Sequence, residues 1–297
     1  MNTELGTLRT VYRQEKNAIS EGLRTPAAST RSIRSVLHKL SRLTDKHLCA
    51  IRTASGLPAE VALVAVGGYG REQLFPASDV DVLLLLPGTD TEAHVHLKTH
   101  LERFIGACWD AGLEIGSSVR TISECVAEAT QDVTVQTAML EARLIDGDAA
   151  LFADFQQQYR AGLNPKAFFT AKTLELRQRH IKHEDTPYAL EPNCKESPGG
   201  LRDLHTILWV SQAAGLGRTW RELAASGIAT EFEASQLERN EATLSLIRAK
   251  LHAISGRHED RLIFDLQTAV AQSLGIQSHT PVGETMPVRA SEVLMRR

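Results

Sequence analysis

The sequence predicts an α+β protein with a small mixed β-sheet and helical flanks. Two short apolar runs, Val61–Val66 and Asp79–Leu86, read as buried strands with a glycine turn between them. A third strand is expected at Leu113–Val119, after a stretch with helical spacing. Beyond Ser123 the pattern is helical almost throughout, so the sheet is confined to one part of the chain.

The N-terminal part is predicted to be helical. Between Ser29 and Thr53, apolar residues recur at helical spacing with Lys and Arg between them, and Gly56 and Pro58 then interrupt the pattern. We therefore expect three parts. Residues 1–58 form a helical segment, residues 59–146 form the sheet domain, and residues 147–297 form a helical domain that is truncated at its C-terminus.

Turn residues set the limits of the elements in the sheet domain. Gly67–Gly70 cannot comfortably continue the first strand, and Arg71–Phe75 is expected to be a short helix stopped by Pro76. After the second strand and a Pro-Gly turn, Thr91–Trp109 returns to a helical rhythm. The order strand, turn, strand, helix, strand predicts a small mixed sheet with helices against one face.

The C-terminal half is expected to hold helices and one long loop. The turn-rich segment Pro187–Gly200 separates two of the helices, and loops of that length in compact domains are often functional. The predicted helices run over Val133–Leu144, Ala149–Tyr159, Pro165–Lys182, Leu201–Ala213 and Gln236–Ile254.

Composition indicates which partners and which cellular compartment to expect. With 33 basic and 36 acidic residues the formal charge is −3, so neither nucleic acid nor an anionic membrane is an expected partner. No apolar run approaches the roughly 20 residues of a membrane helix, and residues 1–17 do not look like a signal peptide. The four cysteines are scattered, as expected for reduced structural thiols. We expect a cytoplasmic protein.

Two carboxylates at the start of the second strand are the strongest chemical signal. Asp79 and Asp81 occupy alternate positions, so they project to one side with α-carbons roughly 6.5–7 Å apart. That spacing suits two magnesium ions about 3.5–4 Å apart, as phosphoryl transfer requires. An exposed edge strand or a helix cap is the alternative. The run of four leucines that follows argues against it, because charge there needs compensation.

The glycine turn complements this pair. Gly67 and Gly68 allow backbone amides to approach a polyphosphate, a following helix start favours an anion, and Arg71 adds positive charge. The turn has neither the Lys-Ser/Thr of a Walker loop nor the glycine spacing of a dinucleotide fingerprint. Ten residues separate Gly68 from Asp79, and the two signals strengthen each other at that distance.

These residues resemble the signature of the DNA polymerase beta-type nucleotidyltransferase superfamily. Within it, the chain is similar to the protein-PII uridylyltransferases, which belong to bacterial nitrogen sensing. The similarity is strong over about residues 30–215. Its blocks are Gly67–Asp79, Gly116–Thr121, Leu140–Leu144 and Leu190–Asp203.

The resemblance implies transfer of UMP from UTP to a tyrosine of the signalling protein PII, with release of pyrophosphate and use of Mg²⁺. Asp79 and Asp81 then bind metal, and Gly67, Gly68, Arg71 and Ser78 bind the nucleotide. Glu114 is the expected third carboxylate. Asp132 is the fallback, although it could equally cap the following helix.

Several basic residues in family-like blocks have two possible roles. Lys195 and Arg202 could hold triphosphate or an acidic patch on PII, or their segment could serve only as a turn, with Asp203 stabilising a helix start. Arg120 and Arg143 could serve the site, and a buried structural ion pair is equally compatible with either of them.

The chain departs from the family in two respects. Ser117 stands where the family more often has His. Complete members continue into a His-Asp phosphohydrolase domain and ACT domains, whereas this chain has no adjacent His-Asp pair and its last helical pattern, Ala290–Arg297, is cut short. We therefore expect neither UMP removal nor glutamine sensing. A transferase with another acceptor or nucleotide, such as an adenylyltransferase, and a noncatalytic nucleotide-binding module remain alternatives.

Overall fold

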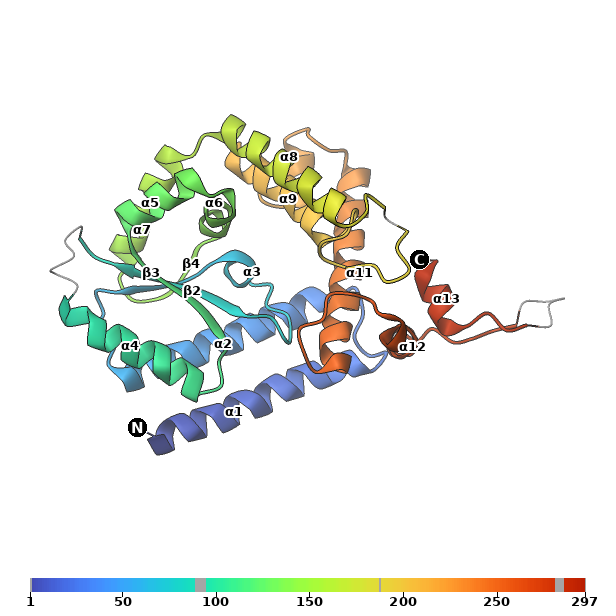
Figure 1. Ribbon diagram of the computed structural model, residues 1–297, viewed down its shortest axis with the longest axis horizontal. Coiled ribbons are helices and arrows are strands. Elements are labelled where there is room, and N and C mark those ends of the chain that lie inside the picture. Colours follow the sequence, from blue (N-terminus) through green and yellow to red (C-terminus); the bar gives the residue numbers. More distant parts are fainter. Residues whose placement is uncertain (1, 89–94, 187, 281–285, 297) are drawn as a thin grey trace. The chain divides into compact units, whose positions relative to one another are not determined.

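The computed structural model describes residues 2–88, 95–186, 188–280 and 286–296 (Figure 1). The chain divides into two compact units. The first comprises residues 1–16, 37–74 and 78–168, and the second comprises residues 17–36, 75–77 and 169–297. Within the described residues the first unit carries a small mixed sheet, and the rest of the structure is largely helical. The predicted α+β class is confirmed.

The sheet has four strands in the order β3-β2-β1-β4 within the described part of the chain. Strand β1 is antiparallel to β2 and β4, and β2 is parallel to β3. The register places Asp81 opposite Gly116 and Leu85 opposite Arg120. This parallel pairing brings two distant segments of the sequence into register. The strands are β1 (Ala62–Ala65), β2 (Val80–Leu86), β3 (Ile115–Thr121) and β4 (Arg143–Asp146).

Helices cover both faces of the sheet, not one face as the sequence predicted. Leu83 and Leu85 pack with α5 (Ile122–Gln131), α6 (Val133–Leu140) and α7 (Ala149–Gly162). Figure 1 shows α2 (Ile33–Ser55) and α4 (Val95–Asp110) along the other face. Because residues 82–86 of β2 are all buried, both faces of that strand need cover. The predicted helix from Thr91 lies outside the described residues before Val95.

Two further predictions about local structure were wrong. The short helix, α3, is Gly67–Gly70 rather than Arg71–Phe75. The backbone turns from β1 directly into this helix at Gly67, whose φ of +58° lies in the left-handed region that glycine tolerates. Residues 143–146 form β4, although a helix was predicted through Leu144. Helix α6 ends at Leu140, and β1 supplies the ladder that turns the next residues into a strand.

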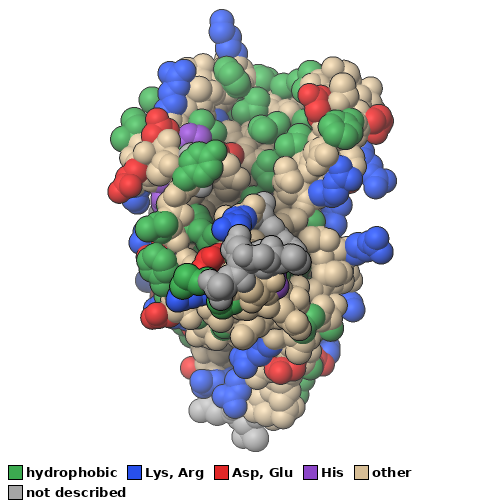
Figure 2. All heavy atoms as spheres, turned by 90° about the vertical axis from the view of Figure 1, so that its right-hand side faces the viewer, with side chains coloured by type: hydrophobic (Ala, Val, Ile, Leu, Met, Phe, Trp, Pro, Cys, Tyr) green, Lys and Arg blue, Asp and Glu red, His purple; other side chains and the backbone are tan. Residues whose placement is uncertain are grey.

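The N-terminal segment, expected to be helical, contains the helix α1 (Asn2–Glu21), although the sequence pattern gave it no separate limits. Its first-unit part packs on α2, where the Tyr12 hydroxyl lies 3.2 Å from the Thr44 hydroxyl and both groups are buried. On the face of the molecule drawn in Figure 2, Lys and Arg side chains are spread among acidic and apolar side chains.

The second unit is helical. Its core forms where α11 packs against α12 and α13, with Leu251 and Val270 fully buried. The buried Lys250 ammonium donates to the carbonyls of Leu23, Thr25 and Ser273, which ties residues 17–36 into this unit. In the described residues no helix has the length and apolar character needed to cross a membrane. The remaining elements are a 3-10 turn (Gly22–Arg24), α8 (Pro165–Lys182), α9 (Leu201–Ala213), α10 (Trp220–Ala225), α11 (Glu231–Ser255), α12 (Phe264–Ser273) and α13 (Ala290–Met295).

Candidate active site

The two aspartates lie where β2 begins. Asp79 immediately precedes the strand and Asp81 is its second residue; both are exposed, whereas Val80 and Val82 are buried. The backbone of Asp81 is held from both sides: its carbonyl accepts from the Val66 amide at 3.1 Å, and β3 pairs along its other edge. The alternation of exposed acids and buried valines gives the two carboxylates one common face of the sheet.

Two glycines lie against the Asp81 carboxylate. A Cβ built on Gly116 would lie 2.7 Å from Asp81 Oδ1, and one built on Gly67 would lie 3.7 Å from Oδ2. Bare backbone therefore flanks this carboxylate on two sides. A side chain at residue 116 would displace the Asp81 carboxylate, so glycine at that position lets the carboxylate keep its place.

The glycine turn supplies backbone amides beside Asp81. Helix α3 begins at Gly67, and the first amides of a helix have no intrahelical partner. The turn is fixed from behind by Tyr69, whose buried hydroxyl donates to Asp45 at 2.6 Å. Burial, reinforced by Asp45, raises the pKa of Tyr69, and Arg143 donates two hydrogen bonds to the same carboxylate, at 2.9 and 3.0 Å. Arg143 therefore has the structural role.

Arg71 lies beside the turn and is already engaged. It pairs with the buried carboxylate of Glu141 and donates from Nε to Gln73 at 3.3 Å. A terminal nitrogen of Arg71 lies 3.7 Å from the Cβ position of Gly68, so its charge adjoins the glycine amides. Ser78 is half-buried, directly before Asp79. The turn, its arginine and both aspartates thus lie close together in the sequence and the fold.

Glu114 directly precedes β3 and is exposed. Its carbonyl accepts from the Val80 amide at 3.0 Å, and continuing the β2–β3 register backwards puts Glu114 beside Asp79, on the face of Asp81. Asp132, the fallback, caps α6 by accepting from the amides of Thr134 and Val135. The bond from the Thr134 amide is the main reason that the pKa of Asp132 is lowered. Its role as a cap is confirmed.

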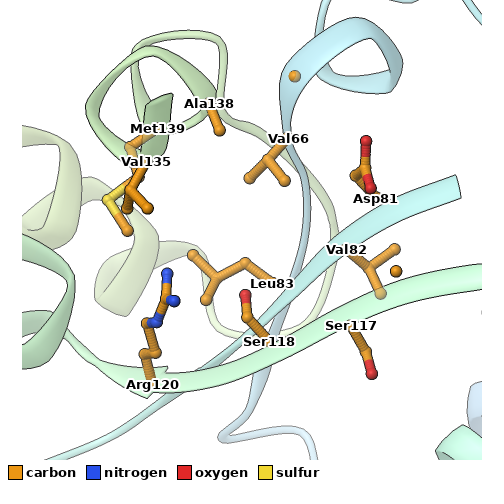
Figure 3. A pocket seen from close by; sticks show the side chains of 12 residues that line it. Val66, Asp81, Val82, Leu83, Ser117, Ser118, Arg120, Val135, Ala138 and Met139 are labelled. Atoms are coloured by element: carbon orange, nitrogen blue, oxygen red, sulfur yellow. The ribbon is translucent and has the colours of Figure 1, made fainter. Parts of the chain in front are cut away.

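A cavity of about 350 Å³ extends from Asp81 between the sheet and α6 (Figure 3). Figure 3 shows Asp81 at one end, Arg120 at the other, and the side chain of Ser118 pointing inward while that of Ser117 points away. Arg120 forms an ion pair with Glu128 at 2.5 Å. The cavity is lined by Val66, Gly67, Asp81, Val82, Leu83, Gly116, Ser117, Ser118, Arg120, Val135, Ala138 and Met139.

Sequence reasoning missed most of this lining. The block Gly116–Thr121 was noted for its resemblance to the family, but Gly116 was not recognised as the neighbour of Asp81. No pattern in the sequence indicated the wall formed by Val135, Ala138 and Met139, because these residues of α6 read as ordinary helix core.

Lys195 and Arg202 lie in the second unit, in a cluster of alternating charge. Both pair with Glu196, Lys195 at 3.6 Å and Arg202 at 3.1 Å. Burial and the neighbouring Arg202 lower the pKa of Lys195. The Arg202 guanidinium also lies 5.4 Å from the centre of the Trp209 ring. The structure therefore brings these two predicted residues together.

Asp203 has the structural role that was the alternative for this segment. It accepts from the Gly199 amide at 2.8 Å and pairs with Arg179 at 2.5 Å and His180 at 2.9 Å. Gly200 is required by close packing, since a Cβ there would lie 2.8 Å from the Ser197 carbonyl oxygen. These contacts give the segment a rigid local geometry.

The glycine turn after β1, with two carboxylates at the start of β2, is the arrangement in which the sequence resembles the nucleotidyltransferase superfamily. Residues 167–296 match the family model described as GlnD PII-uridylyltransferase. Curated relatives extend this similarity over almost the whole chain.

The relatives are bacterial proteins named bifunctional uridylyltransferase/uridylyl-removing enzyme. The chain is 54% identical over 289 residues to the protein of Burkholderia orbicola (strain AU 1054), a match that covers 97% of this chain and 32% of the relative. It is 55% identical over 286 residues to the Burkholderia vietnamiensis protein, covering 96% and 32%. For the Burkholderia mallei (strain SAVP1) protein it is 56% over 270 residues, covering 91% and 30%. The chain thus spans about a third of the length of these relatives.

Proposed function

We propose that the chain transfers UMP from UTP to a tyrosine hydroxyl of protein PII and releases pyrophosphate. The observation that carries the proposal is the exposed pair Asp79 and Asp81 beside the glycine turn, in a chain whose relatives are named uridylyltransferases. UTP and PII are the proposed substrates, and the cytoplasm is the proposed compartment.

The donor set fits magnesium. Asp79, Asp81 and Glu114 offer carboxylate oxygens, which are the ligands that Mg²⁺ prefers. When bound, Mg²⁺ would neutralise charge on the phosphates and polarise the attacked phosphoryl group.

The protein groups have separate tasks in this proposal. Asp79 and Asp81 hold the metal, and the amides of Gly67 and Gly68, with Arg71 and Ser78, bind the phosphates. The tyrosine oxygen forms a bond to the α-phosphorus while the bond to the bridging oxygen breaks, so pyrophosphate leaves. Glu114 is the third metal-binding carboxylate in this proposal, and it would help the metal to activate the tyrosine oxygen by accepting the phenolic proton. Lys195 and Arg202 are proposed to bind triphosphate or an acidic patch on PII.

The test is transfer of label from UTP or ATP to PII by the full chain in the presence of Mg²⁺. We expect the wild-type chain to transfer label from UTP to PII. Asp81→Asn should transfer none, because it keeps the size of the side chain and removes its charge. Asp110→Asn, at an exposed position at the end of α4, is the matched control and should transfer normally. Circular dichroism checks that both variants are folded.

Other outcomes would replace the proposal. Label from ATP alone, or on another acceptor, would indicate a different nucleotidyltransferase. Absence of transfer under every condition would favour a noncatalytic nucleotide-binding module. Substantial turnover by Asp81→Asn would show that the chemistry lies elsewhere in the chain.

A further inference from the structure

We propose that the cavity beside Asp81 holds the ribose and base of the nucleotide, and that Arg120 recognises the 4-carbonyl group of a uracil ring. This inference rests on the proposed nucleotide transfer and adds the residues that select the base. It concerns the first unit alone, where the cavity is enclosed by β2, β3 and α6.

The order of groups along the cavity matches a nucleotide. Asp81 pairs with Gly116 and Leu85 with Arg120, so four residues of strand, roughly 13 Å at about 3.3 Å per residue, separate the two levels. Figure 3 places Asp81 and Arg120 at opposite ends of the space. With the α-phosphate at Asp81, the ribose and base extend toward Arg120.

The walls suit a flat ring. Val135, Ala138 and Met139 project from α6, opposite Leu83 of the sheet. Apolar walls with a few fixed polar groups are typical of small-molecule sites, and a methionine sulfur packs favourably against an aromatic edge. The inward Ser118 hydroxyl supplies a polar group partway along the cavity. A nucleoside therefore finds both an apolar slot and polar contacts.

The chemistry of Arg120 favours uracil. A guanidinium has five N–H donors and no acceptor, so it can donate to the 4-carbonyl of uracil. Cytosine and adenine present an amino group, itself a donor, where uracil presents its 4-carbonyl, and a donor facing a donor leaves both unsatisfied. Arg120 thereby separates UTP from CTP and ATP by hydrogen bonding.

The ion pair with Glu128 prepares Arg120 for this role. It engages a terminal nitrogen of Arg120, whose side chain is 23% exposed, whereas that of Glu128 is 48% exposed. A pair with one partner so accessible contributes only modestly to stability. Its consequence is to fix the guanidinium at the cavity end while leaving it donors for a ligand.

The experiment measures binding of UTP, CTP and ATP to the full chain by calorimetry with Mg²⁺ and without PII. We expect the wild type to prefer UTP and Arg120→Met to lose about 10- to 100-fold of its UTP-over-CTP preference, the range for the loss of one buried hydrogen bond that leaves its partner unsatisfied. Arg120→Lys should recover only part of it. The matched control is Arg103→Met, at an exposed position on α4, and it should keep the wild-type preference.

Glu128→Gln separates recognition from structural support. It removes the ion pair and keeps the guanidinium, so we expect most of the UTP preference to remain. Equal losses in Arg120→Met and Glu128→Gln would overturn direct recognition by Arg120. The same conclusion would follow from a wild type that binds UTP and CTP equally, or from an Arg120→Met variant with unchanged preference.

A second variant tests the cavity without touching Arg120. Ala138→Leu should fill the space and weaken UTP binding at least tenfold while the protein stays folded; unchanged binding would contradict the assigned location. Because these measurements need no acceptor, they separate the two proposals. Base-selective binding without transfer to PII would contradict the proposed function alone. Transfer to PII with unaltered base selectivity in Arg120→Met would contradict this inference alone.

Discussion

Gly116→Ala tests the active-site geometry most directly. The added methyl group would lie 2.7 Å from Asp81 Oδ1, about 0.7 Å inside the shortest ordinary contact of 3.4 Å. Since β3 is paired with β2 along its whole length, the backbone of Gly116 cannot simply withdraw. The Asp81 carboxylate must therefore rotate or shift by a comparable distance.

The expected result is a loss of activity with little loss of stability. A displacement of about 1 Å in a group that orients reactants lowers a rate by as much as roughly 100-fold, so we expect kcat/KM for UMP transfer to fall ~10- to 100-fold. Gly116 is exposed, and alanine suits a strand better than glycine, so the free energy of unfolding should change by less than about 1 kcal/mol.

The assay is single-turnover transfer from labelled UTP to PII, with urea unfolding on the same preparations. Gly106→Ala is the matched control, because an added Cβ there meets no atom within 4 Å. It should leave transfer unchanged and stabilise α4 by up to about 1 kcal/mol. Normal kcat/KM in Gly116→Ala would refute the assignment of Asp81 as a metal-holding group.

Two further predictions concern stability. Gly70→Ala should destabilise the first unit by about 1–3 kcal/mol in urea unfolding, because its Cβ would overlap the Glu141 carbonyl group; an unchanged midpoint would contradict that packing. For pH, burial lowers the pKa of His252 despite its hydrogen bond to Asp260. The unfolded chain then takes up the proton first, so stability is full above about pH 6.5 and falls below it. His252→Gln should flatten that decline between pH 7.5 and 5.5, and an equal slope in the variant would rule out His252 as its source.

Short-range patterns predicted the elements whose signals are local. Helices α8 and α9 have the predicted limits, because their apolar spacing and flanking turns coincide. The leucine run predicted β2 correctly, but its burial on both faces depends on helices elsewhere in the chain. Strand β4 depends still more on its partner. These four residues follow a helix, and they form a strand because β1 supplies the backbone hydrogen bonds.

The same distinction between local and long-range signals applies to the candidate site. Asp79 and Asp81 could be predicted to share a face because alternation is a property of a single strand. The contact between Asp81 and Gly116 could not, since it depends on the parallel register with β3. The cavity wall on α6 was equally inaccessible, because a core methionine and a ligand-facing methionine have the same spacing in sequence.

Two sequence blocks that resemble the family at separate places form one support for the glycine turn. Residue 70 has no side chain because the Glu141 carbonyl lies where one would be, and Arg71 pairs with the carboxylate of the same Glu141. Asp45 of α2 joins Tyr69 to Arg143. The block Leu140–Leu144 therefore acts from behind the turn, with no need to touch a nucleotide. A buried carboxylate with two partners fixes the geometry of residues 67–70 more firmly than propensity can.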